Sequence, residues 1–213
     1  MSEHREKVIV TKLNVAYNQL QQATERMVDD KNGGLDNIWG DYPLQTYSEL
    51  LPKYIKVTEV KRTKTKVCCK NRAGTLLGVT YGNGKMYTLP SGAEIFIYTN
   101  SKAGGTYVRC NMTTQYNGTL YFNGCGEMVI DVDGFNRGRN IIGYDVFKVA
   151  LVKNGLLPVG MPKEGVWTHK FDECLNDGSW YPYGCTAWVI QNKNMDYLHC
   201  PDELGWNKQS SCK

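Results

Sequence analysis

The sequence lacks the features that mark a membrane-spanning chain or a familiar enzyme. No stretch approaches the roughly 20 apolar residues that a membrane-spanning helix needs, and the opening MSEHREK has no apolar secretion-signal core. The nucleophile elbow GxSxG, the zinc motif HExxH, the dinucleotide fingerprint GxGxxG and the phosphate-binding loop are all absent. We therefore expect a protein that works by assembly or binding and is not an enzyme.

Zinc ligands are also scarce. No two cysteines are separated by two residues, and the chain has only three histidines. A structural zinc site needs closely spaced ligand pairs. An even count of eight cysteines instead predicts a disulfide framework and a location outside the cytosol, ahead of a cytosolic protein with free thiols. These cysteines are Cys68, Cys69, Cys110, Cys125, Cys174, Cys185, Cys200 and Cys212.

One long helix is predicted over residues 4–31. Apolar residues recur there at steps of three and four, which places them on one face of a helix. A Gly-Gly pair at 33–34 supplies the stop signal. We expect this face to pack in the domain's own core, with assembly contacts on the other side of the helix. The residues of the stripe are Ile9, Leu13, Ala16, Leu20, Ala23 and Met27.

The remaining chain predicts an antiparallel sheet over residues 73–160. Short runs of β-forming residues alternate with turn signals, of which Asn83-Gly84 is the strongest hairpin signal. Residues 35–72 are expected to form an irregular connector with a short helix near Tyr47–Leu51. Residues 161–213 are expected to be a looped region pinned to the sheet by disulfides, with a short helix near Cys185–Gln191. The whole chain, 1–213, is thus predicted to be one α+β domain in which the helix packs on the sheet.

Most of the cysteine pairing stays open, because eight cysteines allow about 105 connectivities. Cys174 with Cys185 and Cys200 with Cys212 are the simplest local pairs. The adjacent Cys68 and Cys69 point to opposite faces if they lie on a strand, and are then expected to bond different partners.

Acidic residues lie at the end of the segment 127–132 and in the loop that follows it. Asp131, Asp133 and Asp145 are candidate calcium ligands, and Asn136 and Asn140 add carbonyl oxygens. Calcium takes six to eight oxygen ligands, so such a set is suitable, although its spacing does not match an EF-hand loop. The alternative, which we favour, is a polar turn in which Asp and Asn side chains accept hydrogen bonds from backbone amides.

The run 53–72 holds eight Lys or Arg residues against the single acid Glu59. Such a run can contact nucleic acid, but a solvated loop or a lysine-protected strand edge is the favoured interpretation. In the C-terminal region, Trp180 and Trp188 are candidates for a ligand-binding groove.

Three segments resemble type IV pilins and type II secretion pseudopilins. They are HREKVIVTKLNVAYNQLQQATERMV, IDVDGFNRGRNIIGYDVFKVALVKNGLLPVG and CTAWVIQNKNMDYLHC. The resemblance implies a bacterial filament subunit, anchored in the inner membrane before assembly and then packed against copies of itself or other pilin-like subunits at the cell surface. The resemblance implies no required cofactor. Calcium, at the acidic residues described above, is the one ion that we consider.

The chain departs from that family at its start, where the leader and the apolar first half of the helix are missing. We expect it to be the soluble head of such a subunit, with Met1 an added start. The alternative is a secreted or tip-located binding module whose ligand could be DNA.

Overall fold

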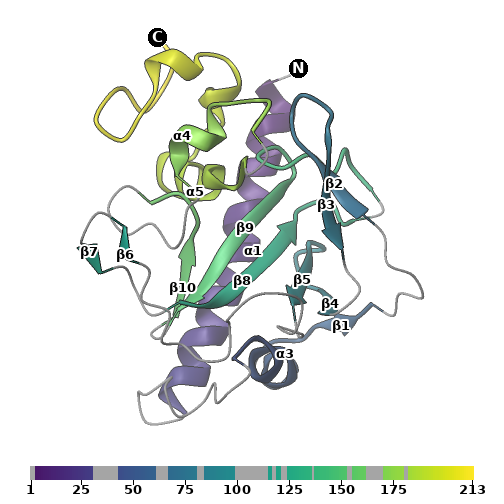
Figure 1. Ribbon diagram of the computed structural model, residues 1–213. Helices are drawn as coiled ribbons and strands as arrows, with labels where there is room; N and C mark the ends of the chain where they lie inside the picture. The colour runs from purple at the N-terminus through teal and green to yellow at the C-terminus, as the bar shows by residue number, and fades with distance from the viewer. Residues whose placement is uncertain are drawn as a thin grey trace.

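The architecture is a long helix packed on an antiparallel sheet, with a disulfide-bonded C-terminal region at one end (Figure 1). The computed structural model describes residues 3–30, 43–60, 67–80, 84–98, 115–116, 119–120, 124–135, 137–152, 155–161, 170–179 and 182–213. This is the predicted α+β fold class.

Helix α1 spans Glu3–Asp29, close to the predicted 4–31. The Gly-Gly stop signal lies outside the described residues. All six residues of the predicted stripe are buried, with exposures of 0–1%. They belong to one cluster with residues from the sheet and from the C-terminal helices. Burial of this face stabilises the helix more than its intrinsic propensity does, because isolated helices are marginal in water.

The main sheet has six strands in the order β1-β4-β5-β8-β9-β10, and every neighbouring pair is antiparallel. From β4 onward the order follows the chain, with the small β6–β7 hairpin inserted between β5 and β8. The strands are β1 Thr58–Glu59, β4 Gly84–Thr88, β5 Glu94–Tyr98, β8 Gly124–Asp131, β9 Val146–Val152 and β10 Gly155–Pro158; the hairpin is β6 Gln115–Tyr116 and β7 Thr119–Leu120.

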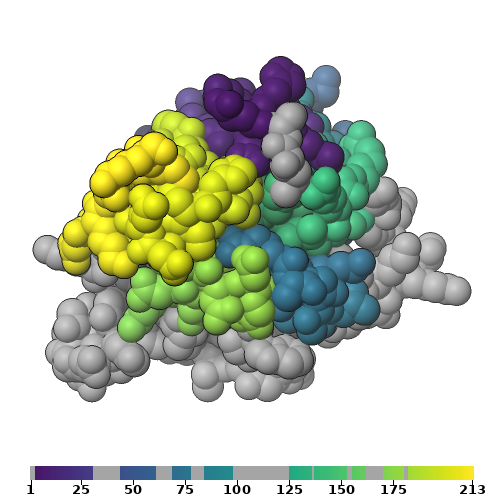
Figure 2. Space-filling model, turned by 90° about the horizontal axis from the view of Figure 1, so that it is seen from above, coloured from purple at the N-terminus to yellow at the C-terminus, as the bar shows by residue number. Residues whose placement is uncertain are grey.

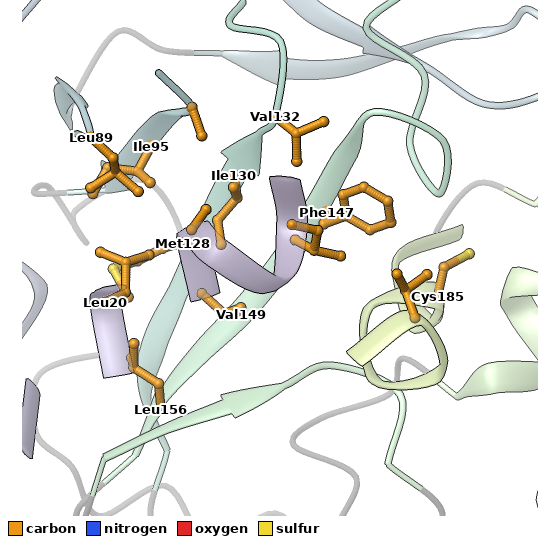
Figure 3. Packing of buried hydrophobic residues seen from close by; sticks show 14 of the residues in the cluster. Leu20, Leu89, Ile95, Met128, Ile130, Val132, Phe147, Val149, Leu156 and Cys185 are labelled. Atoms are coloured by element: carbon orange, nitrogen blue, oxygen red, sulfur yellow. The ribbon is translucent and has the colours of Figure 1, made fainter. Parts of the chain in front are cut away.

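Strand β9 is buried on both faces of the sheet. Phe147 and Val149 point into the cluster that contains Leu20 of α1 (Figure 3). Val146 and Ala150, each next in sequence to one of these residues, belong to a second cluster on the opposite face. Successive side chains of a strand alternate between faces, so a two-sided core requires apolar residues at nearly every position, as the sequence VFKVALV provides.

The predicted Asn83-Gly84 hairpin is wrong in its pairing. Strand β3, Leu76–Thr80, does not pair with β4, but forms a separate two-stranded sheet with β2, Val67–Lys70. Strand β4 already has a neighbour on each side, β1 and β5. A turn signal marks where the chain reverses, but not which strands become neighbours.

The connector 35–72 is more ordered than predicted. It contains helix α3, Pro43–Tyr54, as well as β1 and β2. The predicted short helix, Tyr47–Leu51, covers the middle of α3. The predicted helix ends at Leu51, before a proline, because proline disfavours a helical conformation in the residue that precedes it. In the structure the helix continues through Pro52 to Tyr54.

The C-terminal region contains helix α4, Phe171–Cys174, and helix α5, Cys185–Asn192, the latter close to the predicted helix at 185–191. Disulfides join Cys174 to Cys185 and Cys200 to Cys212, the two pairs favoured by sequence proximity. Cys69 and Cys125 are also disulfide-bonded. The side chains of Cys68 and Cys110 lie outside the described part of the chain.

Candidate functional site

The acidic loop between β8 and β9 contains a carboxylate that is fully buried. Asp131 is 0% exposed, and its Oδ1 accepts hydrogen bonds from the backbone amides of Asp133 at 3.0 Å and Gly134 at 2.8 Å. Its Oδ2 is buried without a hydrogen-bond partner among the described residues. Burial, together with the negative charge of Asp145, raises the pKa of Asp131 to about 8. At neutral pH this side chain is therefore mainly protonated.

Asp145 closes the same loop from its other end. One carboxylate oxygen accepts from the amides of Arg139 at 2.6 Å and Asn140 at 3.0 Å, and the other accepts from Ile141 at 2.6 Å. Burial raises the pKa of Asp145, and these amide donors oppose the rise. Asn140 has a positive φ of 54°, which asparagine tolerates better than most residues.

Asp133 links the loop to helix α1. Its Oδ1 accepts from the ammonium group of Lys12 at 2.5 Å, and both side chains are partly exposed. This contact joins residues 121 positions apart, and no local sequence pattern signals it.

The three candidate calcium ligands thus have protein partners in this structure. Nothing in the described part of the chain forms a group of three or more His, Cys, Asp or Glu side chains able to hold a metal ion. Asn136 lies outside the described residues, and the side-chain oxygen of Asn140 is buried without a partner among them. The arrangement has the geometry of the polar turn. Calcium binding stays a prediction. The unpartnered side-chain oxygens of Asp131 and Asn140 are the atoms that could bind the ion.

The solvent side of α1 carries a second stripe. Val8 and Val15 are 39% and 42% exposed, which makes them two of the three large exposed hydrophobic residues in the described part of the chain. Steps of three and four residues connect them with the exposed Thr11, Asn18 and Gln22, so all five lie on one face. None of them is charged. We call Val8, Thr11, Val15, Asn18 and Gln22 the uncharged stripe.

Two polar contacts hold the C-terminal region against the rest of the domain. Arg72, after strand β2, donates to Asp177 Oδ1 and to the Cys174 carbonyl oxygen, each at 2.5 Å. At the start of α1, the buried Glu6 lies 2.9 Å from His199 Nε2. Neither pair could be found from the sequence, because each joins segments more than 100 residues apart.

The aromatic residues of the tail are mainly core residues. Trp188 is fully buried, stacks on Phe171 with ring centroids 4.1 Å apart, and lies 5.3 Å from Trp206. Trp180 lies outside the described residues, so the proposed groove around Trp180 and Trp188 receives no support. Part of the basic run also falls outside them, since residues 61–66, with four of its eight basic residues, are not described.

Comparison with protein-family models, with curated protein sequences and with solved structures finds no match to this chain. In the described residues, no helix combines the length and the apolar composition needed to cross a lipid bilayer.

Proposed function

We propose that this domain is the head of a pilin-like or pseudopilin-like filament subunit that works outside the bacterial cytosol. The observation that carries the proposal is the uncharged stripe of α1, with Val8 and Val15 exposed seven residues apart on the otherwise polar solvent side of the helix. The resemblance noted in the sequence gives the reason to assign this stripe to assembly. The disulfides agree with an oxidising compartment.

The two faces of α1 suit such a role. The buried stripe fixes the helix on the sheet, so the opposite stripe is presented on a rigid support. Exposed valines gain free energy when another surface covers them, roughly 25 cal/mol for each Å² of apolar area removed from water. The partner in this proposal is a second copy of the chain or a related subunit. A contact between different surfaces of identical subunits extends into an open helical filament when its rotation does not close a ring.

A photo-crosslinking residue at position 15 tests the proposal. Benzoylphenylalanine in place of Val15 should give a covalent dimer on illumination, in cells that express the full-length gene product. The matched control carries the same residue in place of Leu76, which is 60% exposed on β3. Leu76 is more exposed than Val15, so random collision would crosslink it more.

Dimer from position 15 and little from position 76 would support assembly through α1. Equal yields at the two positions, or none at 15, would reject the uncharged stripe as the contact surface.

A further inference from the structure

A cluster of basic side chains lies at the end of the domain where α1 begins. Arg5 in the first turn of α1, Lys70 at the end of β2, and Arg137 and Arg139 in the acidic loop are all exposed. Figure 2 looks down on this end and shows the first turns of α1 in purple, the loop in green and the β2–β3 turn in blue on one face. We call these four residues the basic face.

Specific contacts bring the three segments together. The backbone of Lys70 pairs with the loop through bonds of 2.9 Å to Asn140 and from Ile142. The guanidinium carbons of Arg5 and Arg139 lie 5.9 Å and 5.2 Å from the centre of the same ring, that of the buried Tyr144. Arg5 and Arg139 are therefore both placed around one buried ring.

The acids around this cluster do not cover it. Glu3 and Asp133, which are exposed and partly exposed, form ion pairs with Lys7 and Lys12. Asp177, exposed beside the β2–β3 turn, pairs with Arg72, and Glu6, Glu94, Asp131 and Asp145 are buried. The buried Asp145 accepts from the backbone amide of Arg139, so it holds the backbone of the loop while the Arg137 and Arg139 side chains are exposed.

We propose that the basic face rests on anionic phospholipid headgroups while the subunit is still anchored in the membrane. This inference rests on the proposed function and on the resemblance to pilins, which implies a membrane anchor before α1. The axis of α1 runs toward the viewer in Figure 2, so a membrane crossed by that axis would lie parallel to the basic face. Guanidinium groups bind phosphate oxygens through two parallel hydrogen bonds, and Lys and Arg side chains extend readily to a headgroup layer.

Vesicle co-sedimentation of the domain tests the inference. The vesicles contain equal parts of phosphatidylglycerol and phosphatidylcholine, and phosphatidylcholine alone serves as the neutral control. Each basic residue near an anionic surface strengthens binding by a factor of about five. The double variant Arg5→Gln/Lys70→Gln should therefore bind the mixed vesicles about 25-fold more weakly, and salt at about 0.5 M should abolish binding.

The matched control is Lys53→Gln/Lys56→Gln, which changes the net charge by the same amount. These exposed lysines lie near the end of α3, away from the basic face (Figure 1). Both double variants should first be shown to keep the thermal stability of the parent. Unchanged binding of the control would support the inference. Equal losses in the two variants, or equal binding to neutral vesicles, would overturn it.

Duplex DNA serves as a competitor in the same assay. If DNA binds the parent more tightly than the vesicles do, with the same dependence on Arg5 and Lys70, the face is a nucleic-acid surface and the lipid assignment is wrong. Photo-crosslinking from position 15 is independent of lipid. Failure of vesicle binding therefore leaves filament assembly standing, and failure of crosslinking rejects the uncharged stripe that carries the proposed function.

Discussion

Replacing Asp131 with Asn examines the buried carboxylate at the end of β8. An Asn at this position keeps an oxygen to accept the amides of Asp133 and Gly134, but it cannot ionise. In the parent, Asp131 has a pKa of about 8 against an ordinary value of 3.8. The variant therefore isolates the effect of charge on the folded state.

The sign follows from the raised pKa. Between about pH 4 and pH 8 the unfolded chain has lost the proton of Asp131 while the folded chain keeps it. The contribution of this proton to the free energy of unfolding is fully present below about pH 4 and is lost as the pH rises through about 8. The difference in pKa corresponds to at most about 5–6 kcal/mol over the whole interval. Burial also raises the pKa of Asp145, so its contribution has the same sign.

Urea unfolding with the disulfides intact, followed by tryptophan fluorescence from about pH 5 to about pH 9, gives the measurement. The free energy of unfolding of the parent should fall by several kcal/mol over this interval, and that of Asp131→Asn by much less. Asp133→Asn, in the same loop but paired with Lys12, should keep the slope of the parent. Parallel curves for the parent and Asp131→Asn would refute the assignment of a buried, protonated carboxyl.

Calcium enters the same experiment. If the ion binds the ionised loop, calcium should raise the stability of the parent near pH 8, where Asp131 begins to ionise, and leave Asp131→Asn unchanged. No response to calcium in either protein would remove the predicted metal site.

Three further predictions concern packing and covalent links. Gly184→Ala should cost about 3 kcal/mol because a Cβ there would lie 2.0 Å from the Lys170 carbonyl oxygen, whereas Gly178→Ala, with nothing nearer than 3.6 Å, should change the free energy of unfolding little. Lys193→Gly should stabilise the domain by about 0.5 kcal/mol in the same assay, because this C-cap has a φ of 57° that favours glycine; stability equal to or below that of the parent would contradict this. Mild reduction followed by alkylation and mass mapping should label the partly exposed Cys200–Cys212 bond before the buried Cys174–Cys185 bond.

The sequence predicts those parts of the fold that depend on local periodicity. Helix α1 was accessible because its buried residues recur at helical spacing, and α5 because an apolar run follows Gly184. The pairing of β3 with β2 could not be predicted. An Asn-Gly pair indicates that the chain turns there, but it does not specify which strand lies beside β4.

The polar contacts were the least predictable part of the site. Asp131 and Asp145 stood out as acids in a turn, but no local pattern indicates that both are fully buried. Lys12 and Asp133 meet across 121 positions of the chain, and Arg72 and Asp177 across 105. Such pairs depend on the final arrangement of helix and sheet, so no pattern within a short window could indicate them.

The two proposed surfaces follow from one structural cause. Helix α1 packs on the sheet through one stripe, which leaves the uncharged stripe exposed and places Arg5 of the first turn against Tyr144 of the loop between β8 and β9. Lys12 fixes that loop through Asp133, and the buried carboxylates order its backbone amides. The loop can then present Arg137 and Arg139 beside Arg5. Asp131 and Asp145 thus order the loop that carries Arg137 and Arg139 of the proposed lipid-binding face, and the helix that Lys12 ties to this loop carries the proposed assembly surface.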